Sequence, residues 1–427
     1  MGIGIGILGG GTVGGALVRR LVDNRDVIAA KTGLQLEVLR VGVRTLDKER
    51  GFDLLPGVLT DSVADVVADD SVEMLVEVMG GMDPAGDLVL AALRAGKPVV
   101  TANKELIAAR GPELFQTAEE AGVSLLFEAA VGGGIPIIRP LWETLAGETL
   151  TKVMGIVNGT TNFILTAMSE SGMAYKVALA EAQRLGYAER DPSSDVTGVD
   201  AAAKAAILAG LAFGSWVGAD AVYREGITGL DPVDLRFAAE LGYVVKPLAV
   251  AERTEQGVNA RVYPAMLLTH HPLASVRGAR NAISIEGPAV QRLLFSGPGA
   301  GGEPTASAVL GDIITAAREL RAGTLVAPRI RLADGGVADF GGVSTMWYLR
   351  LVVVDQPGVL AQIAAVFGHH GVSIGSVRQE CSGDEATVLI VTHSAPERAQ
   401  QAARDGLRGL GVVSDVAAAI RVESTES

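Results

Sequence analysis

One stretch, residues 181–204, brings together ionisable side chains that could bind an amino acid whose side-chain carbonyl or alcohol group reacts. From Gly198 the chain reads GVDAAAKAAILAGLAF, a helix that is apolar on every side and whose only charges are Asp200 and Lys204. This pattern is typical of a buried helix. A lysine buried there costs stability, and proteins keep one mostly where chemistry needs it. Glu189 and Asp200 could hold an ammonium group while Lys204 hydrogen-bonds the reacting oxygen. A purely structural ion pair is the alternative.

A second pattern, near the N-terminus, predicts a dinucleotide site. Residues 9–14 read GGGTVG, which fits G-x-G-x-x-G between an expected strand and an expected helix. In that setting, backbone amides and the start of the helix receive a pyrophosphate. The next strand ends at Arg44, where an NAD-selective site usually has a carboxylate. A guanidinium there favours a 2′-phosphate and hence NADPH; a solvated surface arginine is the alternative.

Three further motifs follow expected strands, the position at which open α/β sheets bind ligands. TANKE, residues 101–105, places Lys104 where it could touch cofactor or substrate, or remain in solvent. EAAVGGGIPII, residues 128–138, has three glycines that would let carbonyls turn toward a monovalent cation or a substrate. A flexible crossover between domains fits that segment equally well. NGTTN, residues 158–162, could bind a carboxylate, although a helix cap is the default interpretation.

The elements around these motifs indicate an α/β protein with a doubly wound parallel sheet at its N-terminus. Strands and helices alternate over the first 130 residues, which predicts a parallel sheet covered by helices. The expected strands are 2–8, 37–43, 74–79, 98–101 and 124–128, and the expected helices between them include 15–28, 86–95 and 112–121. The middle of the chain mixes helices, among them one expected over 137–145, with strands. Its tail follows the β-α-β-β-α-β order of a ferredoxin-like module.

Composition excludes several classes of protein. The 36 basic and 49 acidic residues give a net charge of −13, which argues against binding to nucleic acid or to an anionic membrane. No segment has 18 uninterrupted apolar residues, and the first residues lack the basic region of a signal peptide. Cys381 is the single cysteine, which fits a reducing compartment. We therefore expect a cytoplasmic protein. The five histidines show no metal-binding spacing.

Taken together, the motifs resemble those of homoserine dehydrogenase in its long form, which ends in an ACT domain. GGGTVG, TANKE, EAAVGGGIP, NGTTNFI, GPGAGGEPTA and the tail pattern DQPGVL…GVSI occur in the family's order over essentially the whole chain. The resemblance implies reduction of L-aspartate 4-semialdehyde to L-homoserine with NAD(P)H. It also implies four segments: a Rossmann-type domain (1–135, completed by a helix near 303–320), an α+β substrate and dimerisation domain (136–302), a linker (321–345) and the ACT domain (346–427).

The resemblance also assigns roles to individual residues. Lys204 would donate a proton to the aldehyde oxygen with Lys104 assisting, and Glu189 and Asp200 would bind the substrate's amino group. The implied cofactor residues are Gly9, Gly11, Thr12, Val13, Gly14, Arg44, Lys104, Gly186 and Gly301. The implied sodium site uses largely main-chain oxygens of Glu128, Val131, Gly133 and Ile135.

Partners and rival functions follow from the same resemblance. We expect a homo-oligomer, either dimer or tetramer, whose ACT domain binds an amino-acid effector such as threonine or serves only for assembly. A rival enzyme is another nicotinamide reductase acting on a small amino acid or keto acid. The Glu189, Asp200 and Lys204 set disfavours any substrate that lacks an ammonium group. A rival of another class, an amino-acid sensor without activity, is disfavoured by the presence of Lys104 and Lys204.

Overall fold

A computed structural model of the chain describes residues 2–52, 54–325, 332, 336–382 and 385–423. The chain forms two compact units. The first unit comprises residues 1–153, 206–219 and 281–335, and the second comprises 154–205, 220–280 and 336–427. The predicted linker, 321–345, includes residues 326–331 and 333–335, which lie outside the described residues.

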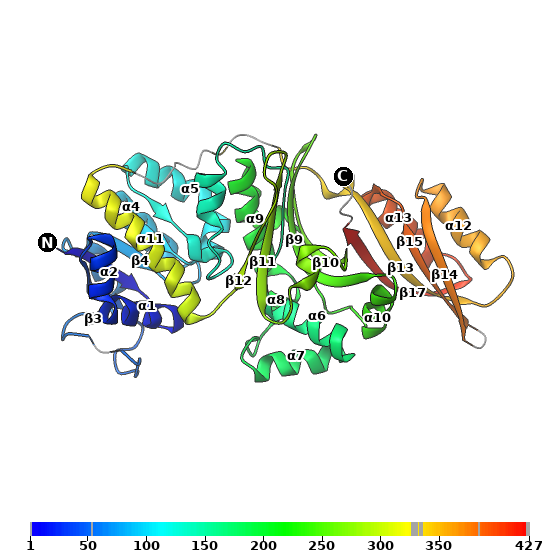
Figure 1. Ribbon diagram of the computed structural model, residues 1–427, viewed down its shortest axis with the longest axis horizontal. Helices are drawn as coiled ribbons and strands as arrows, with labels where there is room; N and C mark the ends of the chain where they lie inside the picture. The colour runs from blue at the N-terminus through cyan, green and yellow to red at the C-terminus, as the bar shows by residue number, and fades with distance from the viewer. Residues whose placement is uncertain (1, 53, 326–331, 333–335, 383–384, 424–427) are drawn as a thin grey trace. The chain divides into compact units, whose positions relative to one another are not determined.

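The first unit is built on a parallel sheet of six strands in the order β3-β2-β1-β4-β5-β6 (Figure 1). The strands are β1 (Ile3–Leu8), β2 (Leu36–Gly42), β3 (Leu59–Thr60), β4 (Met74–Glu77), β5 (Val99–Thr101) and β6 (Leu125–Leu126). The strand order reverses between β1 and β4, and ligands bind beyond the carboxyl ends of the strands at such a point. The predicted doubly wound sheet is confirmed.

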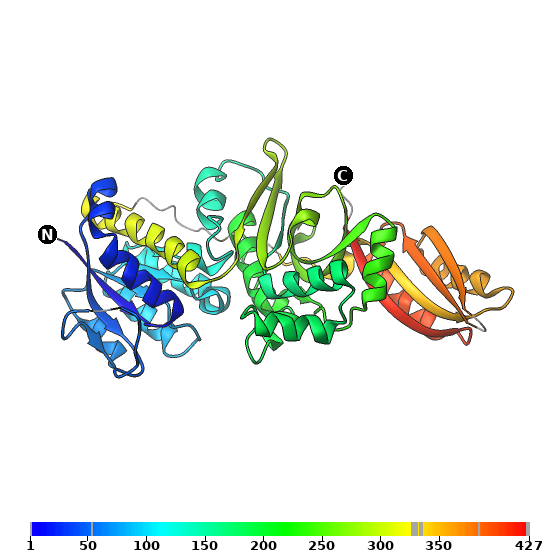
Figure 2. The same cartoon turned by 60° about the horizontal axis from the view of Figure 1, so that its bottom comes forward.

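Helices cover this sheet and complete its core. They are α1 (Thr12–Asp23), α2 (Arg25–Thr32), α3 (Val63–Ala68), α4 (Ala85–Arg94), α5 (Lys104–Ala121) and α11 (Gly302–Ala322). α11 lies beside α1 in both ribbon views, and its Val309 and Ile313 share a core with Ile5 and Leu17 (Figures 1 and 2). A helix from far along the chain therefore closes the N-terminal fold.

The first unit also contains a hairpin and a short π-helix. β11 (Arg280–Gly287) and β12 (Gln291–Pro298) pair as neighbours, a hairpin that the sequence pattern did not reveal. The helix expected over 137–145 is present over 138–144, and its second part, Pro140–Thr144, is π-helical.

In the second unit, one long sheet runs in the order β7-β9-β10-β17-β13-β15-β14. The central hairpin is β9 (Tyr243–Thr254) with β10 (Gly257–Leu268), and β7 (Lys152–Ile156) leads into it. The accompanying helices are α6 (Gly159–Ser171), α7 (Tyr175–Arg184), α8 (Ser193–Val196), α10 (Pro232–Glu240) and the first half of α9 (Val199–Phe213). Apolar side chains of α6, α7 and α10 form a core with β9 and β10.

The C-terminal module has the predicted β-α-β-β-α-β order. Its elements are β13 (Ser344–Val354), α12 (Val359–His369), β14 (Ile374–Ser382), β15 (Glu385–Thr392), α13 (Glu397–Arg408) and β17 (Val413–Glu423). Both helices pack against one sheet through a shared apolar core. β17 also pairs in parallel with β10, with Ala265 opposite Arg421. The module is therefore continuous with the sheet of the second unit.

Within the described part of the chain, no helix is both long and apolar enough to cross a membrane.

Candidate active site

The glycine loop joins β1 to α1 and leaves the start of that helix open. A Cβ on Gly14 would lie 1.9 Å from the Gly9 carbonyl oxygen, so the turn requires glycine there, whereas a Cβ on Gly11 would meet no atom within 4 Å. Gly11 is the N-cap of α1 and no side chain caps it. The helix begins at Thr12 and not at Gly15 as predicted, so Thr12 and Val13 belong to the first turn. Their amides are among those that lack an intrahelical acceptor.

Basic side chains line the cleft beyond this loop. Arg44, two residues after the end of β2, is exposed and shares the cleft with Lys48 and Arg50, which sequence reasoning did not single out. The Arg50 guanidinium donates to the carbonyls of Lys48 (2.7 Å), Leu46 (3.0 Å) and Thr45. It thereby folds the segment that carries Arg44 and Lys48. The cleft can accept the phosphate groups of a dinucleotide.

Two more predicted cofactor residues of the first unit lie at helix starts. Lys104 is the first residue of α5, and Asn103 caps that helix by accepting a hydrogen bond from the Leu106 amide at 3.1 Å. Gly301 precedes α11 with φ of +123°, a backbone conformation that favours glycine. A Cβ on the next residue, Gly302, would lie 2.9 Å from the Thr12 carbonyl oxygen. The start of α11 therefore closely approaches the glycine loop.

The buried carboxylate of Glu128 organises the next loop. Its two oxygens accept hydrogen bonds from the amides of Ile137 (2.5 Å), Ile138 (2.7 Å) and Arg139 (3.0 Å). Burial raises the pKa of Glu128, and the three amides oppose that shift. Because this side chain serves the backbone, a cation here would have to use main-chain carbonyls.

The second unit contains the buried acid–lysine pair. The Lys204 ammonium lies 2.7 Å from Asp200 Oδ2 and 2.8 Å from the Val157 carbonyl oxygen. Only 9% of Lys204 and 6% of Asp200 are exposed, as expected for a helix that is apolar all round. An ammonium has three N–H donors. Two of those on Lys204 bind described residues, which leaves one for a substrate oxygen.

Asn158 connects this pair to a further acid that sequence reasoning missed. Its side-chain oxygen caps α6 by accepting from the Thr161 amide at 2.9 Å. Its side-chain nitrogen donates to Asp195 Oδ1 at 2.7 Å and to Asp200 Oδ2 at 2.9 Å. The predicted cap is thus also a bridge between two carboxylates. The only sequence signal for Asp195 was its place in the polar segment before α9.

Glu189 and Gly186 lie apart from these hydrogen bonds. Glu189 is exposed, and its main-chain carbonyl accepts a hydrogen bond from Gln183 Nε2 at 3.1 Å. Gly186 lies in the exposed turn after α7 with φ of +78°. The acids bridged around Lys204 are therefore Asp195 and Asp200, and the structure does not bring Glu189 into this cluster.

Comparisons with known proteins agree with the geometry. A family model described as homoserine dehydrogenase matches residues 136–314, its NAD-binding domain matches 9–128, and an ACT domain matches 347–408. The chain is 48% identical to homoserine dehydrogenase of Mycobacterium tuberculosis, over 99% of this chain and 98% of that protein.

Solved structures give the same result. The crystal structure of a homoserine dehydrogenase from Thiobacillus denitrificans matches with a TM-score of 0.94 and 41% identity, covering 99% of both chains. A hyperthermophilic archaeal homoserine dehydrogenase in complex with NADPH matches with a TM-score of 0.60 and 31% identity, covering 75% of this chain and 98% of that one.

Proposed function

The chain belongs to the homoserine dehydrogenase family, and on that premise we propose that Lys204 donates the proton in NAD(P)H-dependent reduction of L-aspartate 4-semialdehyde to L-homoserine. The observation that carries this assignment is the buried ammonium held between Asp200 and the Val157 carbonyl, with one N–H left over. The bound nicotinamide supplies the hydride. Negative charge then develops on the substrate oxygen, where a positioned ammonium is most effective.

The substrate's own ammonium group needs anionic partners. Asp200 is a predicted partner, and its carboxylate shares the Asn158 amide with Asp195. We include Asp195 in the substrate site on that basis. Glu189 remains a predicted ligand, from an exposed position on the turn after α7. Lys104, at the start of α5, is the proposed assisting lysine near the nicotinamide.

A substrate panel tests the reaction, and a lysine variant tests the assignment. We expect NADPH oxidation with aspartate semialdehyde to exceed that with keto acids or aldehydes that lack an ammonium group. Lys204→Ala should lower kcat by at least about 100-fold and leave NADPH binding, followed by nicotinamide fluorescence, nearly intact. Lys176→Ala, which removes an exposed lysine on α7, is the matched control. A near-normal kcat for Lys204→Ala would exclude it as the donor.

The nicotinamide cofactor is proposed to be NADPH in preference to NADH. Arg44 and Lys48 line the cleft at the end of β2, where they can neutralise a 2′-phosphate. The archaeal family member whose structure was solved in complex with NADPH supports this choice. Gly9, Gly11, Gly14, Thr12 and Val13 would hold the pyrophosphate, with Gly301 beside them.

A sodium ion is proposed in the loop after β6. The main-chain carbonyls of Glu128, Val131, Gly133 and Ile135 belong to buried residues. None of the four accepts a backbone hydrogen bond from a described residue outside regular elements. Buried carbonyls that lack such partners suit a hard cation. The thermal unfolding midpoint should rise more in NaCl than in choline chloride at equal ionic strength, and equal midpoints would contradict the site.

The ACT domain is proposed to bind an amino-acid effector, with threonine as the first candidate, and the protein is proposed to be a homo-oligomer. The family match over 347–408 supports a sensing module. Titration of threonine into the NADPH oxidation assay distinguishes a regulatory module from one that serves only for assembly. A regulatory module that binds threonine changes the rate, whereas a module that serves only for assembly leaves the rate unchanged.

A further inference from the structure

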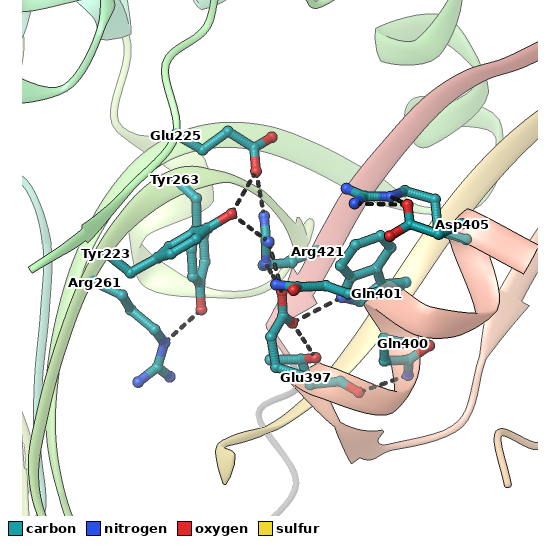
Figure 3. Close-up of polar contacts among 12 residues, drawn as sticks. Tyr223, Glu225, Arg261, Tyr263, Glu397, Gln400, Gln401, Asp405 and Arg421 are labelled. Carbon is teal, nitrogen blue, oxygen red and sulfur yellow. Dashed lines mark hydrogen bonds and ion pairs between the residues drawn. The ribbon is translucent and has the colours of Figure 1, made fainter. Parts of the chain in front are cut away.

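Arg421, on the last strand of the ACT domain, lies buried among residues from the ACT domain and from the catalytic part of the second unit (Figure 3). Its guanidinium donates to Glu397 Oε1 at 2.6 Å, to Glu225 Oε2 at 2.6 Å and to the Tyr223 hydroxyl at 2.9 Å. Glu397 starts α13 of the ACT domain. Tyr223 belongs to β8 (Tyr223–Arg224), which pairs with β10, and Glu225 follows it. One side chain therefore joins the two parts.

On the ACT side, this guanidinium is held rigidly. The fully buried Glu397 carboxylate also accepts hydrogen bonds from the Thr345 hydroxyl at 2.7 Å and from Trp347 Nε1 at 3.0 Å. The centroid of the Trp347 ring lies 5.0 Å from the guanidinium carbon, and the ring of Tyr263, on β10 of the catalytic part, lies at the same distance. Cation–π contacts and charge-assisted hydrogen bonds together determine where Arg421 lies. The ACT fold thus supplies the buried carboxylate and the indole ring that hold Arg421 on this side.

On the side of the catalytic part, the segment after Glu225 contacts the end of α8. The Ile227 amide donates to the Val196 carbonyl at 3.0 Å, and a Cβ on Gly226 would lie only 2.3 Å from that oxygen. Val196 ends α8 directly after Asp195, whose carboxylate is bound to Asn158. The contacts therefore run without a gap from Arg421 to the carboxylates around Lys204.

A small pocket lies beside this path. Asn158, Asp195, Glu225 and Tyr263 line this pocket together with Val196 and Gly226. A densely packed wall would resist a displacement of α8, whereas a pocket next to Val196 does not.

We infer that Arg421 is a positioning residue for the substrate site, through which the ACT domain sets the placement of the Asp195 and Asp200 carboxylates. The contact passes through Glu225 and the Val196 carbonyl, and it changes affinity for the substrate without touching the substrate. This inference rests on the proposed role of the two carboxylates in binding the substrate's ammonium group.

The test uses the full chain and removes the Glu225 carboxylate, which binds Arg421. Because the Glu225 side chain is 38% exposed, its removal leaves the buried core of the ACT domain intact. Glu225→Ala should raise KM for aspartate semialdehyde about threefold to tenfold, with kcat and KM for NADPH within about twofold of wild type. Glu225→Gln keeps an acceptor for Arg421 and should give a smaller rise in the same KM. Glu240→Ala breaks another ion pair to the ACT domain, Arg378 to Glu240 at 2.7 Å, and should leave all three constants unchanged.

Hydrogen exchange gives a readout that does not depend on turnover. In Glu225→Ala, the backbone amides of residues 193–198 should exchange faster, while those of α12 and α13 keep their wild-type protection. An unchanged KM with unchanged exchange would overturn the inference, and so would equal effects of Glu225→Ala and Glu240→Ala. If the wild-type protein does not reduce aspartate semialdehyde, the proposed function fails instead, and the exchange measurement still tests the path.

Discussion

At the residue scale, two contacts of Lys204 explain how a lysine is tolerated in an apolar helix. Asp200 compensates its charge, and the Val157 carbonyl fixes its direction. Breaking such a buried pair leaves an uncompensated charge, which is strongly destabilising. For this reason the pair alone does not distinguish structure from chemistry. The adjoining Asp195 and Asn158 favour chemistry, because an ion pair needs neither of them.

Arg44 is the residue whose exchange should alter cofactor choice. Arg44→Asp places a carboxylate where a ribose 2′-hydroxyl would be bound and where a 2′-phosphate would be repelled. We expect kcat/KM for NADPH to fall by about 10-fold or more while that for NADH rises or holds. Steady-state kinetics with both cofactors check this. Unchanged ratios would show that Arg44 does not contact the ribose end, and Arg94→Asp on α4 is a surface control.

Lys246, on β9, should make stability depend on pH. Its ammonium is buried and donates to the Val276 carbonyl at 2.5 Å, and burial lowers its pKa from 10.5 to about 8. Because the folded state then binds the proton more weakly than the unfolded state, Lys246 destabilises the fold below pH 8, and this cost fades between pH 8 and 10.5.

Lys246→Met should therefore raise the free energy of unfolding at pH 7, by on the order of 1–3 kcal/mol. The advantage should shrink as the pH approaches 10.5. Urea denaturation at pH 7, 9 and 10.5 measures it, with Lys176→Met as the exposed control. An advantage that grows with pH would contradict the assigned direction.

At the scale of elements, α6 shows one residue in two roles. Asn158→Ser keeps a capping oxygen for the Thr161 amide but removes the amide group that bridges Asp195 and Asp200. Serine and asparagine cap equally well, so the loss of stability should come only from the missing hydrogen bonds to the two carboxylates, about 1–3 kcal/mol, while KM for aspartate semialdehyde rises about 10-fold.

The comparison variant, Asn158→Ala, removes both roles. It should show the same KM effect together with a further loss of about 1 kcal/mol in stability, because α6 loses its cap. Thermal and chemical denaturation combined with steady-state kinetics separate the two effects. If the serine variant kept the wild-type KM, Asn158 would be only a cap.

At the scale of the whole molecule, the ACT domain is part of the second unit's sheet. β17 pairs with β10 over Ala265–Leu267, and Arg350 of β13 binds Asp234 of α10 at 2.6 Å. The buried Tyr348 and Met266 share one core. The module therefore contributes to the fold that holds the catalytic residues.

Ending the chain after Gly342 should consequently do more than remove an effector site. It would leave part of β10 without its parallel neighbour and expose Met266 and Tyr263. We expect a thermal midpoint lower by about 5 °C or more and increased binding of a hydrophobic dye. A truncated chain with the wild-type midpoint and activity would show that the ACT domain is an independent appendage.

Local sequence patterns predict much of the fold of this protein. Residue spacing within one or two elements is enough to predict the glycine loop, the buried α9 helix and the β-α-β-β-α-β tail. Element ends were less accurate, as at Thr12 and Lys104, because helix starts depend on which amides find a cap.

Only the tertiary structure decided which distant residues share a site. It joined Asp195 and Asn158 to the Lys204 pair, placed Glu189 at the surface, and set Arg421 of the last strand against Glu225. The physical reason is that local spacing specifies a face of a helix or strand, whereas contacts between distant segments arise from packing and from the pairing of buried charges. The sequence by itself determined the chemistry available to this protein, and the fold determined where that chemistry can act.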